Sequence, residues 1–110
     1  MFGLGKKAHR EIDADQLAAL LKEGRALVVD VREPDEFADG HVPGAVNLPL
    51  SGFDPAAVPH PGDRLVVLNC LGGKRSGMAL DQCAVAQAAI DTHLAGGFKA
   101  WADAGLPVER

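Results

Sequence analysis

The chain has 110 residues, of which 47% are hydrophobic and 24% are charged, with a formal net charge of −4. This length suits one domain, and the composition is that of a globular protein. The negative charge argues against a general nucleic-acid-binding protein, since such domains usually present a basic face. No apolar run reaches the length of about 18 residues that spans a bilayer, and the first residues do not resemble a signal peptide. With two cysteines and no disulfide framework, we expect a cytoplasmic protein.

The first part of the chain predicts a helix, a buried strand and a second, short helix. Asp13, followed three residues later by Gln16, predicts a helix N-terminus, and Gly24 predicts its end. Residues 26–31 form an apolar run with a single acidic residue, which is typical of a strand buried on both faces of a parallel sheet. A short helix is expected over residues 33–38, because a proline occupies its first turn and acidic residues follow.

The rest of the chain continues this alternation of strands and helices. Strands are expected over residues 45–47, 65–69 and 90–94, a loop with one helical turn over 51–63, and helices from Ser76 to about Gln87 and from Gly96 to about Gly105. Strands alternating with helices within one domain predict an α/β fold, with a parallel sheet and helices on both faces.

Cys70 directly follows the predicted strand 65–69, at the sheet edge where open α/β folds bind ligands. Residues 71–75 (LGGKR) form a glycine-rich, basic loop before a helix. The N–H groups of such a loop and the positive end of the helix attract anions, so a thiol there ionises readily. A cysteine at a strand end is ordinarily a small buried hydrophobe. Here a strand, a glycine-rich loop and a helix start coincide, which predicts a reactive cysteine.

Four segments resemble the signatures of the rhodanese family: residues 30–37 (DVREPDEF), 40–47 (GHVPGAVN), 70–76 (CLGGKRS) and 96–101 (GGFKAW). They occur in the family's order over nearly the whole chain. The resemblance implies a rhodanese-like domain over residues 10–110, with a five-stranded parallel sheet and helices on both faces. We expect residues 1–9 to be a flexible N-terminus.

The resemblance also implies a sulfurtransferase. Such an enzyme moves a sulfane sulfur from thiosulfate or a persulfide donor, through a cysteine persulfide, to cyanide or a thiol. Cys70 would be the nucleophile and sulfur carrier. Arg75 would also hold the loop in place, Ser76 would cap the next helix, and Asp30 and Arg32 would form a supporting ion pair. The donor would be bound by the side chains and backbone N–H groups of Leu71, Gly72, Gly73, Lys74 and Arg75.

Two features of the loop bear on the reaction. Four residues separate Cys70 from Arg75, as in rhodanese-like sulfurtransferases, whereas related phosphatases and arsenate reductases have one more. Leu71 stands where many family members have arginine, which weakens the case for thiosulfate as the physiological donor and leaves a protein or small-molecule persulfide as a good alternative. The alternatives are therefore a persulfide relay to a protein partner, a phosphatase or arsenate reductase, and a non-catalytic interaction module, against which Cys70 argues.

Other residues are expected to be structural. Cys83 lies too far along the predicted helix to form a disulfide with Cys70, so we expect a buried thiol. His41 is expected to shape the chain, and His93 has no motif around it. Ala89 stands where the family commonly has glycine, so either Ala89 is strained at a left-handed helix end, or the helix ends in another way around residues 87–89. The sequence predicts no metal, no cofactor, no nucleic acid and no membrane among its partners.

Overall fold

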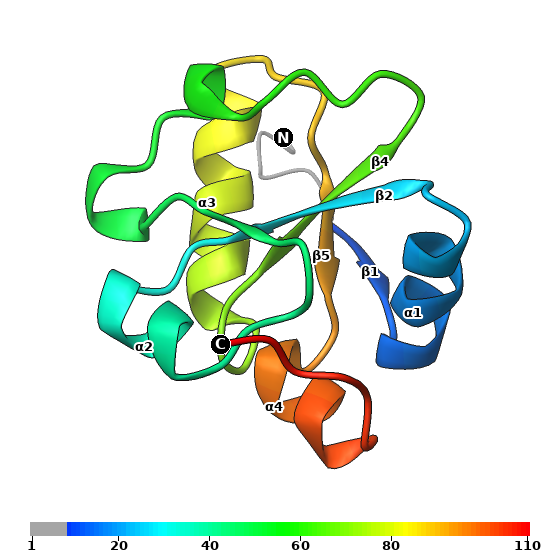
Figure 1. The fold of residues 1–110 in the computed structure, drawn as a ribbon. Coiled ribbons are helices and arrows are strands. Elements are labelled where there is room, and N and C mark those ends of the chain that lie inside the picture. Colours follow the sequence, from blue (N-terminus) through cyan, green and yellow to red (C-terminus); the bar gives the residue numbers. More distant parts are fainter. Residues whose placement is uncertain (1–8) are drawn as a thin grey trace.

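The computed structural model describes residues 9–110, so the segment predicted to be flexible, residues 1–9, lies outside this range except for His9. A sheet of five parallel strands in the order β1-β5-β4-β2-β3 has helices on both faces, which confirms the predicted fold class (Figure 1). None of the helices in this part of the chain has the length and apolarity to span a bilayer. The elements are β1 (Arg10–Ile12), α1 (Ala14–Lys22), β2 (Ala26–Asp30), α2 (Pro34–Asp39), β3 (Val46–Asn47), two 3-10 turns (Leu50–Gly52 and Pro55–Ala57), β4 (Leu65–Asn69), α3 (Lys74–Val85), β5 (Thr92–Leu94) and α4 (Gly97–Asp103).

The central strands are buried on both faces, which explains why their sequences are continuous apolar runs. Along β2, Val29 packs in one cluster with Leu80 of α3, and Val28 packs on the other face with Leu17 of α1 and Trp101 of α4. Burying each such side chain stabilises the fold by about 1.5–3 kcal/mol. The same alternation in β4 sends the residue that follows it, Cys70, toward the α3 face.

Strand β1 was not predicted, because its three residues carry little pattern. Arg10 and Glu11 are exposed, and only Ile12 packs against the core. The strand exists through its pairing with β5, where Glu11 lies opposite His93. This pairing brings a carboxylate from the start of the chain beside a histidine near its end.

Helix α3 begins within the glycine-rich loop rather than after it. Its N-cap is Gly73, whose φ of 108° lies in the left-handed region that glycine adopts without a Cβ clash. Ser76 therefore lies inside the first turn, and the prediction that Ser76 caps the helix is wrong. The early start places the first turn of α3 beside Cys70.

Helix α3 ends in a Schellman motif with a glutamine in the left-handed position. The Ala88 N–H donates to the Cys83 carbonyl at 2.9 Å, and the Gln87 N–H donates to the Ala84 carbonyl at 3.1 Å. Gln87, at φ 58°, is the one non-glycine residue with positive φ in residues 9–110. Of the two alternatives for this helix end, strain at Ala89 is therefore wrong, and the helix ends in another way, with Gln87 in the left-handed position two residues earlier.

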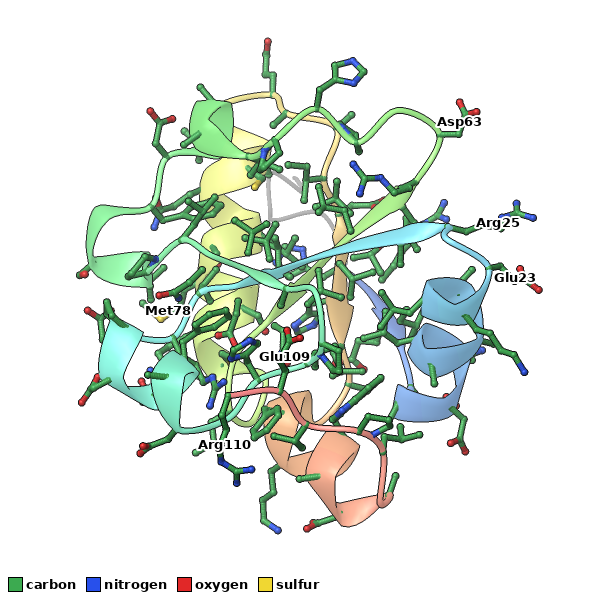
Figure 2. The ribbon with its side chains drawn as sticks, in the orientation of Figure 1. Glu23, Arg25, Asp63, Met78, Glu109 and Arg110 are labelled. Atoms are coloured by element: carbon green, nitrogen blue, oxygen red, sulfur yellow. The ribbon has the colours of Figure 1, made fainter. Side chains whose placement is uncertain are left out.

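The C-terminal residues lie against the turn that follows α2 (Figure 2). Glu109 forms an antiparallel bridge with His41, and the Arg110 Nε donates to the Asp39 carbonyl at 2.8 Å. The His41 ring stacks on Phe37 with 3.7 Å between ring centroids. These contacts give His41 the structural role that was expected of it.

Candidate active site

Cys70 follows β4 directly and is buried, with its sulfur beside the first turn of α3. The Gly73 N–H donates to the Cys70 Sγ at 3.0 Å, and Ser76 Oγ lies 3.5 Å from the same sulfur. Helix α3 has 12 residues, so its aligned peptide dipoles place partial positive charge at this end. The predicted combination of a thiol, loop N–H groups and a helix N-terminus is therefore present.

The two thiols of the chain differ in how readily they ionise. Burial raises the pKa of Cys70, but hydrogen bonds from the Ser76 hydroxyl and from the backbone N–H groups of Ser76, Gly73 and Gly72 outweigh it, so the pKa lies below the usual 9.0. Burial alone acts on Cys83 and raises its pKa to about 11. Both cysteines are free and buried, and Cys70 is the thiol that forms a thiolate more easily.

The start of α4 holds the Cys70 loop by its carbonyl groups. The Phe98 N–H donates to the Cys70 carbonyl at 2.7 Å, and the Lys99 N–H donates to the Leu71 carbonyl at 3.0 Å. Gly97 adopts φ 62°, and a Cβ there would lie 2.5 Å from the Cys70 carbonyl oxygen and closer still to that of Leu71. The close approach of two backbones thus explains why glycine opens this helix.

Arg75 links α3 to α2 instead of pointing a free charge at the sulfur. Its Nη1 and Nη2 donate to the two carboxylate oxygens of Glu36 at 2.7 and 3.0 Å. The hydrogen bond from Arg75 lowers the pKa of Glu36 to about 2. Lys74 is exposed and makes no ion pair within residues 9–110. Sequence reasoning missed Glu36, which resembled any other acid in a first helical turn.

The expected ion pair between Asp30 and Arg32 is present and buried. Arg32 Nη2 donates to the Asp30 carboxylate at 2.8 Å and to the Gly40 carbonyl at 2.7 Å. The guanidinium also lies over the Phe98 ring, 4.6 Å from its centroid. The pair therefore supports the turn after α2 and the start of α4, and through the Phe98 N–H it supports the Cys70 carbonyl.

His93 is a residue near the thiol that sequence reasoning missed. Its Nδ1 lies 2.7 Å from Ser76 Oγ, and its Nε2 lies 3.3 Å from a Glu11 carboxylate oxygen. Burial lowers the pKa of His93, against the opposing effect of Glu11. The ring belongs to β5, and only the unpredicted pairing of β1 with β5 brings Glu11 to it. A prediction of β1 from the sequence would have been needed to place Glu11 beside His93.

The sequence profile of the rhodanese-like domain matches residues 13–104. The chain belongs to the rhodanese-like domain family. This confirms the resemblance carried by the four segments, all of which lie within this range.

Relatives of this rhodanese-like domain include an enzyme of similar length. A sulfurtransferase of Allochromatium vinosum is 36% identical over 99 residues, which cover 89% of this chain and 92% of that protein. An uncharacterized protein of Synechocystis sp. is 42% identical over 91 residues, 83% of this chain but 51% of that protein. The structure of a rhodanese-related protein from Thermoplasma volcanium superposes with a TM-score of 0.77 at 28% identity, covering 92% of this chain and 98% of that one. The chain thus spans about half of the Synechocystis relative and nearly all of the other two.

Proposed function

We propose that this rhodanese-like domain is a sulfurtransferase in which Cys70 carries a sulfane sulfur as a persulfide. The observation that carries the proposal is the Cys70 sulfur at the first turn of α3, where the Gly73 N–H and Ser76 Oγ lower its pKa. A thiolate is the nucleophilic form of cysteine. The sulfurtransferase relative from Allochromatium vinosum supports the same chemistry.

The reaction has two displacement steps at sulfur. The Cys70 thiolate attacks the sulfane sulfur of the donor, the donor's bond to that sulfur breaks, and sulfite or a thiolate leaves with the electron pair. Cyanide or a thiolate then attacks the outer sulfur of the persulfide, and the Cys70 thiolate leaves. Between the steps, N–H groups of the loop would stabilise the negative outer sulfur as an oxyanion hole stabilises oxygen.

The loop disfavours phosphate and arsenate chemistry. Four residues lie between Cys70 and Arg75, none of them an acid that would protonate a leaving group. The carboxylate that binds Arg75 is that of Glu36, which the bidentate ion pair keeps ionised. The short loop and the lack of a general acid therefore favour sulfur transfer over hydrolysis of phosphate or reduction of arsenate.

A persulfide donor is the second candidate, and a specific observation favours it over thiosulfate. The charge of Arg75 is balanced by Glu36, and Leu71 is 46% exposed without a charge. Lys74 is then the one loop side chain whose charge attracts a dianion. A persulfide on a small thiol or a protein carries less negative charge than thiosulfate, so its binding needs less positive charge in the loop. The two free thiols are consistent with the reducing cytoplasm that we propose as the location of this protein.

The mechanism is tested by replacing each thiol in turn. We expect Cys70→Ser to reduce thiosulfate:cyanide sulfur transfer to background with an unchanged far-UV spectrum, because a hydroxyl cannot form the persulfide. Cys83→Ser, the matched control, should retain most of the activity. Activity in the Cys70→Ser variant would exclude the covalent mechanism at Cys70. If a folded Cys83→Ser variant lost as much activity as Cys70→Ser, Cys83 would take part in the reaction and the proposal would be wrong.

A further inference from the structure

A chain of four polar groups leads from the Cys70 sulfur to Glu11 on the edge strand β1. Ser76 Oγ lies 3.5 Å from Cys70 Sγ and 2.7 Å from His93 Nδ1, and His93 Nε2 lies 3.3 Å from a Glu11 carboxylate oxygen. Ser76 is fully buried, Cys70 is 1% exposed and His93 is 6% exposed. Water therefore competes little for the contacts of Ser76 with Cys70 and His93, whereas the Glu11 side chain at the end of the chain is exposed.

The Ser76 hydroxyl has one proton, so it can donate to only one of its two neighbours, Cys70 and His93. This restricts where the other protons of the chain can lie. The Glu11 carboxylate accepts, so His93 Nε2 carries a proton in any state that satisfies this contact. If His93 is neutral, its Nδ1 accepts the Ser76 proton, and Ser76 Oγ accepts from the Cys70 thiol. If Cys70 is a thiolate, Ser76 donates to the sulfur, and His93 Nδ1 must carry a proton to donate to Ser76. The nearby Gly73 carbonyl, 3.2 Å from Ser76 Oγ, only accepts.

We propose that His93 is a positioning residue that receives, through Ser76, the proton that leaves the Cys70 thiol. The proton on Sγ moves to Ser76 Oγ while the Ser76 proton moves to His93 Nδ1, and the electron pair stays on sulfur. The result is a thiolate and an imidazolium separated by one hydroxyl, with Glu11 facing the imidazolium. This inference rests on the proposed function of Cys70 and adds a path for its proton.

Two other titratable residues, His9 and Glu11, lie near the His93 ring and act on its charge in opposite directions. His9 approaches edge-on, with 6.2 Å between ring centroids, and its own Nε2 is bound to Asp81 of α3 at 2.9 Å. The helix side of the ring meets Ser76 and the Gly77 backbone, which carry no charge. Burial, the largest effect, and His9 lower the pKa of His93, and Glu11, the anion in contact with the ring, opposes them.

The test measures how fast Cys70 reacts with iodoacetamide as a function of pH, with the modified peptide quantified by mass spectrometry. His93→Asn keeps a group that can hydrogen-bond to Ser76 but cannot take up a proton, and Ser76→Ala interrupts the path. We expect both to lower the rate near neutral pH by about tenfold, as for a change of one pKa unit, and to match the wild type at a pH above about 10. His60→Asn, on an exposed loop, should change nothing.

A second measurement leaves Ser76 and His93 in place and removes only the thiol. By thermodynamic linkage, a thiolate that favours the imidazolium must raise the pH at which His93 titrates. The His93 ring signals, followed by NMR, should therefore titrate at a lower pH in the Cys70→Ala variant than in the wild type. A histidine that only supports the fold would titrate identically in both.

Unchanged alkylation profiles in the two path variants, or an unchanged His93 titration in Cys70→Ala, would overturn the proton path. Iodoacetamide needs no sulfur donor, so these results leave sulfur transfer untouched. Conversely, a protein that shows both shifts but fails to transfer sulfur from any donor would retain the path and lose the proposed function.

Discussion

Cys70 and Cys83 belong to the same apolar cluster, yet their surroundings direct their chemistry in opposite directions. Burial disfavours the thiolate of both residues, and only Cys70 has N–H and O–H donors that reverse the effect. Each donor comes from residues 72–76, so the same few residues that begin α3 also prepare the thiol. At the scale of single residues, reactivity follows from the hydrogen bonds to sulfur rather than from its exposure.

Position 71 offers a direct test of how the site attracts its donor. Leu71→Arg adds a positive charge at an exposed position beside Cys70. We expect the KM for thiosulfate to fall about fivefold at low ionic strength with kcat unchanged, equivalent to about 1 kcal/mol, and the gain to shrink near 0.15 M salt. Leu65→Arg, at the other end of β4, is the control of equal charge. A KM that stays the same or rises at low salt would contradict this role.

The Glu36–Arg75 ion pair predicts a pH-dependent contribution to stability. The pKa of Glu36 is lowered from 4.5 to about 2 in the folded protein, so the stabilisation is complete above pH 4.5 and is lost as the pH falls toward 2. Glu36→Gln should therefore lower the free energy of unfolding at pH 7. Because the side chains are 33% and 32% exposed, solvent screening limits the effect to about 1 kcal/mol. Urea titrations should show this gap at pH 7 and its closure near pH 2, and a gap independent of pH would refute the assignment.

At the scale of elements, the end of α3 carries strain that a single substitution relieves. A non-glycine residue in the left-handed conformation costs about 1–2 kcal/mol, and the greater unfolded-state entropy of glycine offsets about 0.4–1 kcal/mol of the gain. Gln87→Gly should therefore stabilise the protein by about 0.5–1 kcal/mol, raising the melting temperature by a few degrees. Sulfur transfer should not change, because Gln87 is exposed and lies beyond the far end of α3 from Cys70.

Ala89→Gly is the matched control for this prediction, because Ala89 does not have a positive φ. It relieves no strain and increases the entropy of the unfolded chain, so its melting temperature should fall. If Gln87→Gly melts no higher than the wild type, the left-handed residue is not strained. If Ala89→Gly melts higher, the helix end in solution differs from the Schellman motif.

Elements whose signal is local were predicted from the sequence, and those made by distant pairing were not. The apolar runs of β2 and β4 and the capping box of Asp13 and Gln16 at the start of α1 are all present in the structure. Strand β1 escaped prediction because its three residues become a strand only by pairing with β5. The start of α3 was placed too late because Gly73 at positive φ caps the helix without a side chain.

At the scale of the whole molecule, the site combines segments from most of the chain. The α/β order predicts that Cys70 lies at a sheet edge, but the partners of the loop come from elsewhere: Glu36 from α2, Phe98 from α4 and His93 from β5. No local pattern relates these positions to residues 70–76. The nucleophile was therefore predictable from its own loop, whereas the groups that support it required the fold.

The account depends most directly on where a transferred sulfur resides. The protein, freshly reduced and then incubated with thiosulfate or with a small-molecule persulfide, should be digested and its cysteine peptides weighed. We predict an added mass of about 32 Da, one sulfur atom, on the Cys70 peptide and none on the Cys83 peptide, removed by cyanide with release of thiocyanate. An unmodified Cys70 after exposure to both donors, or the added sulfur on Cys83, would contradict the central claim.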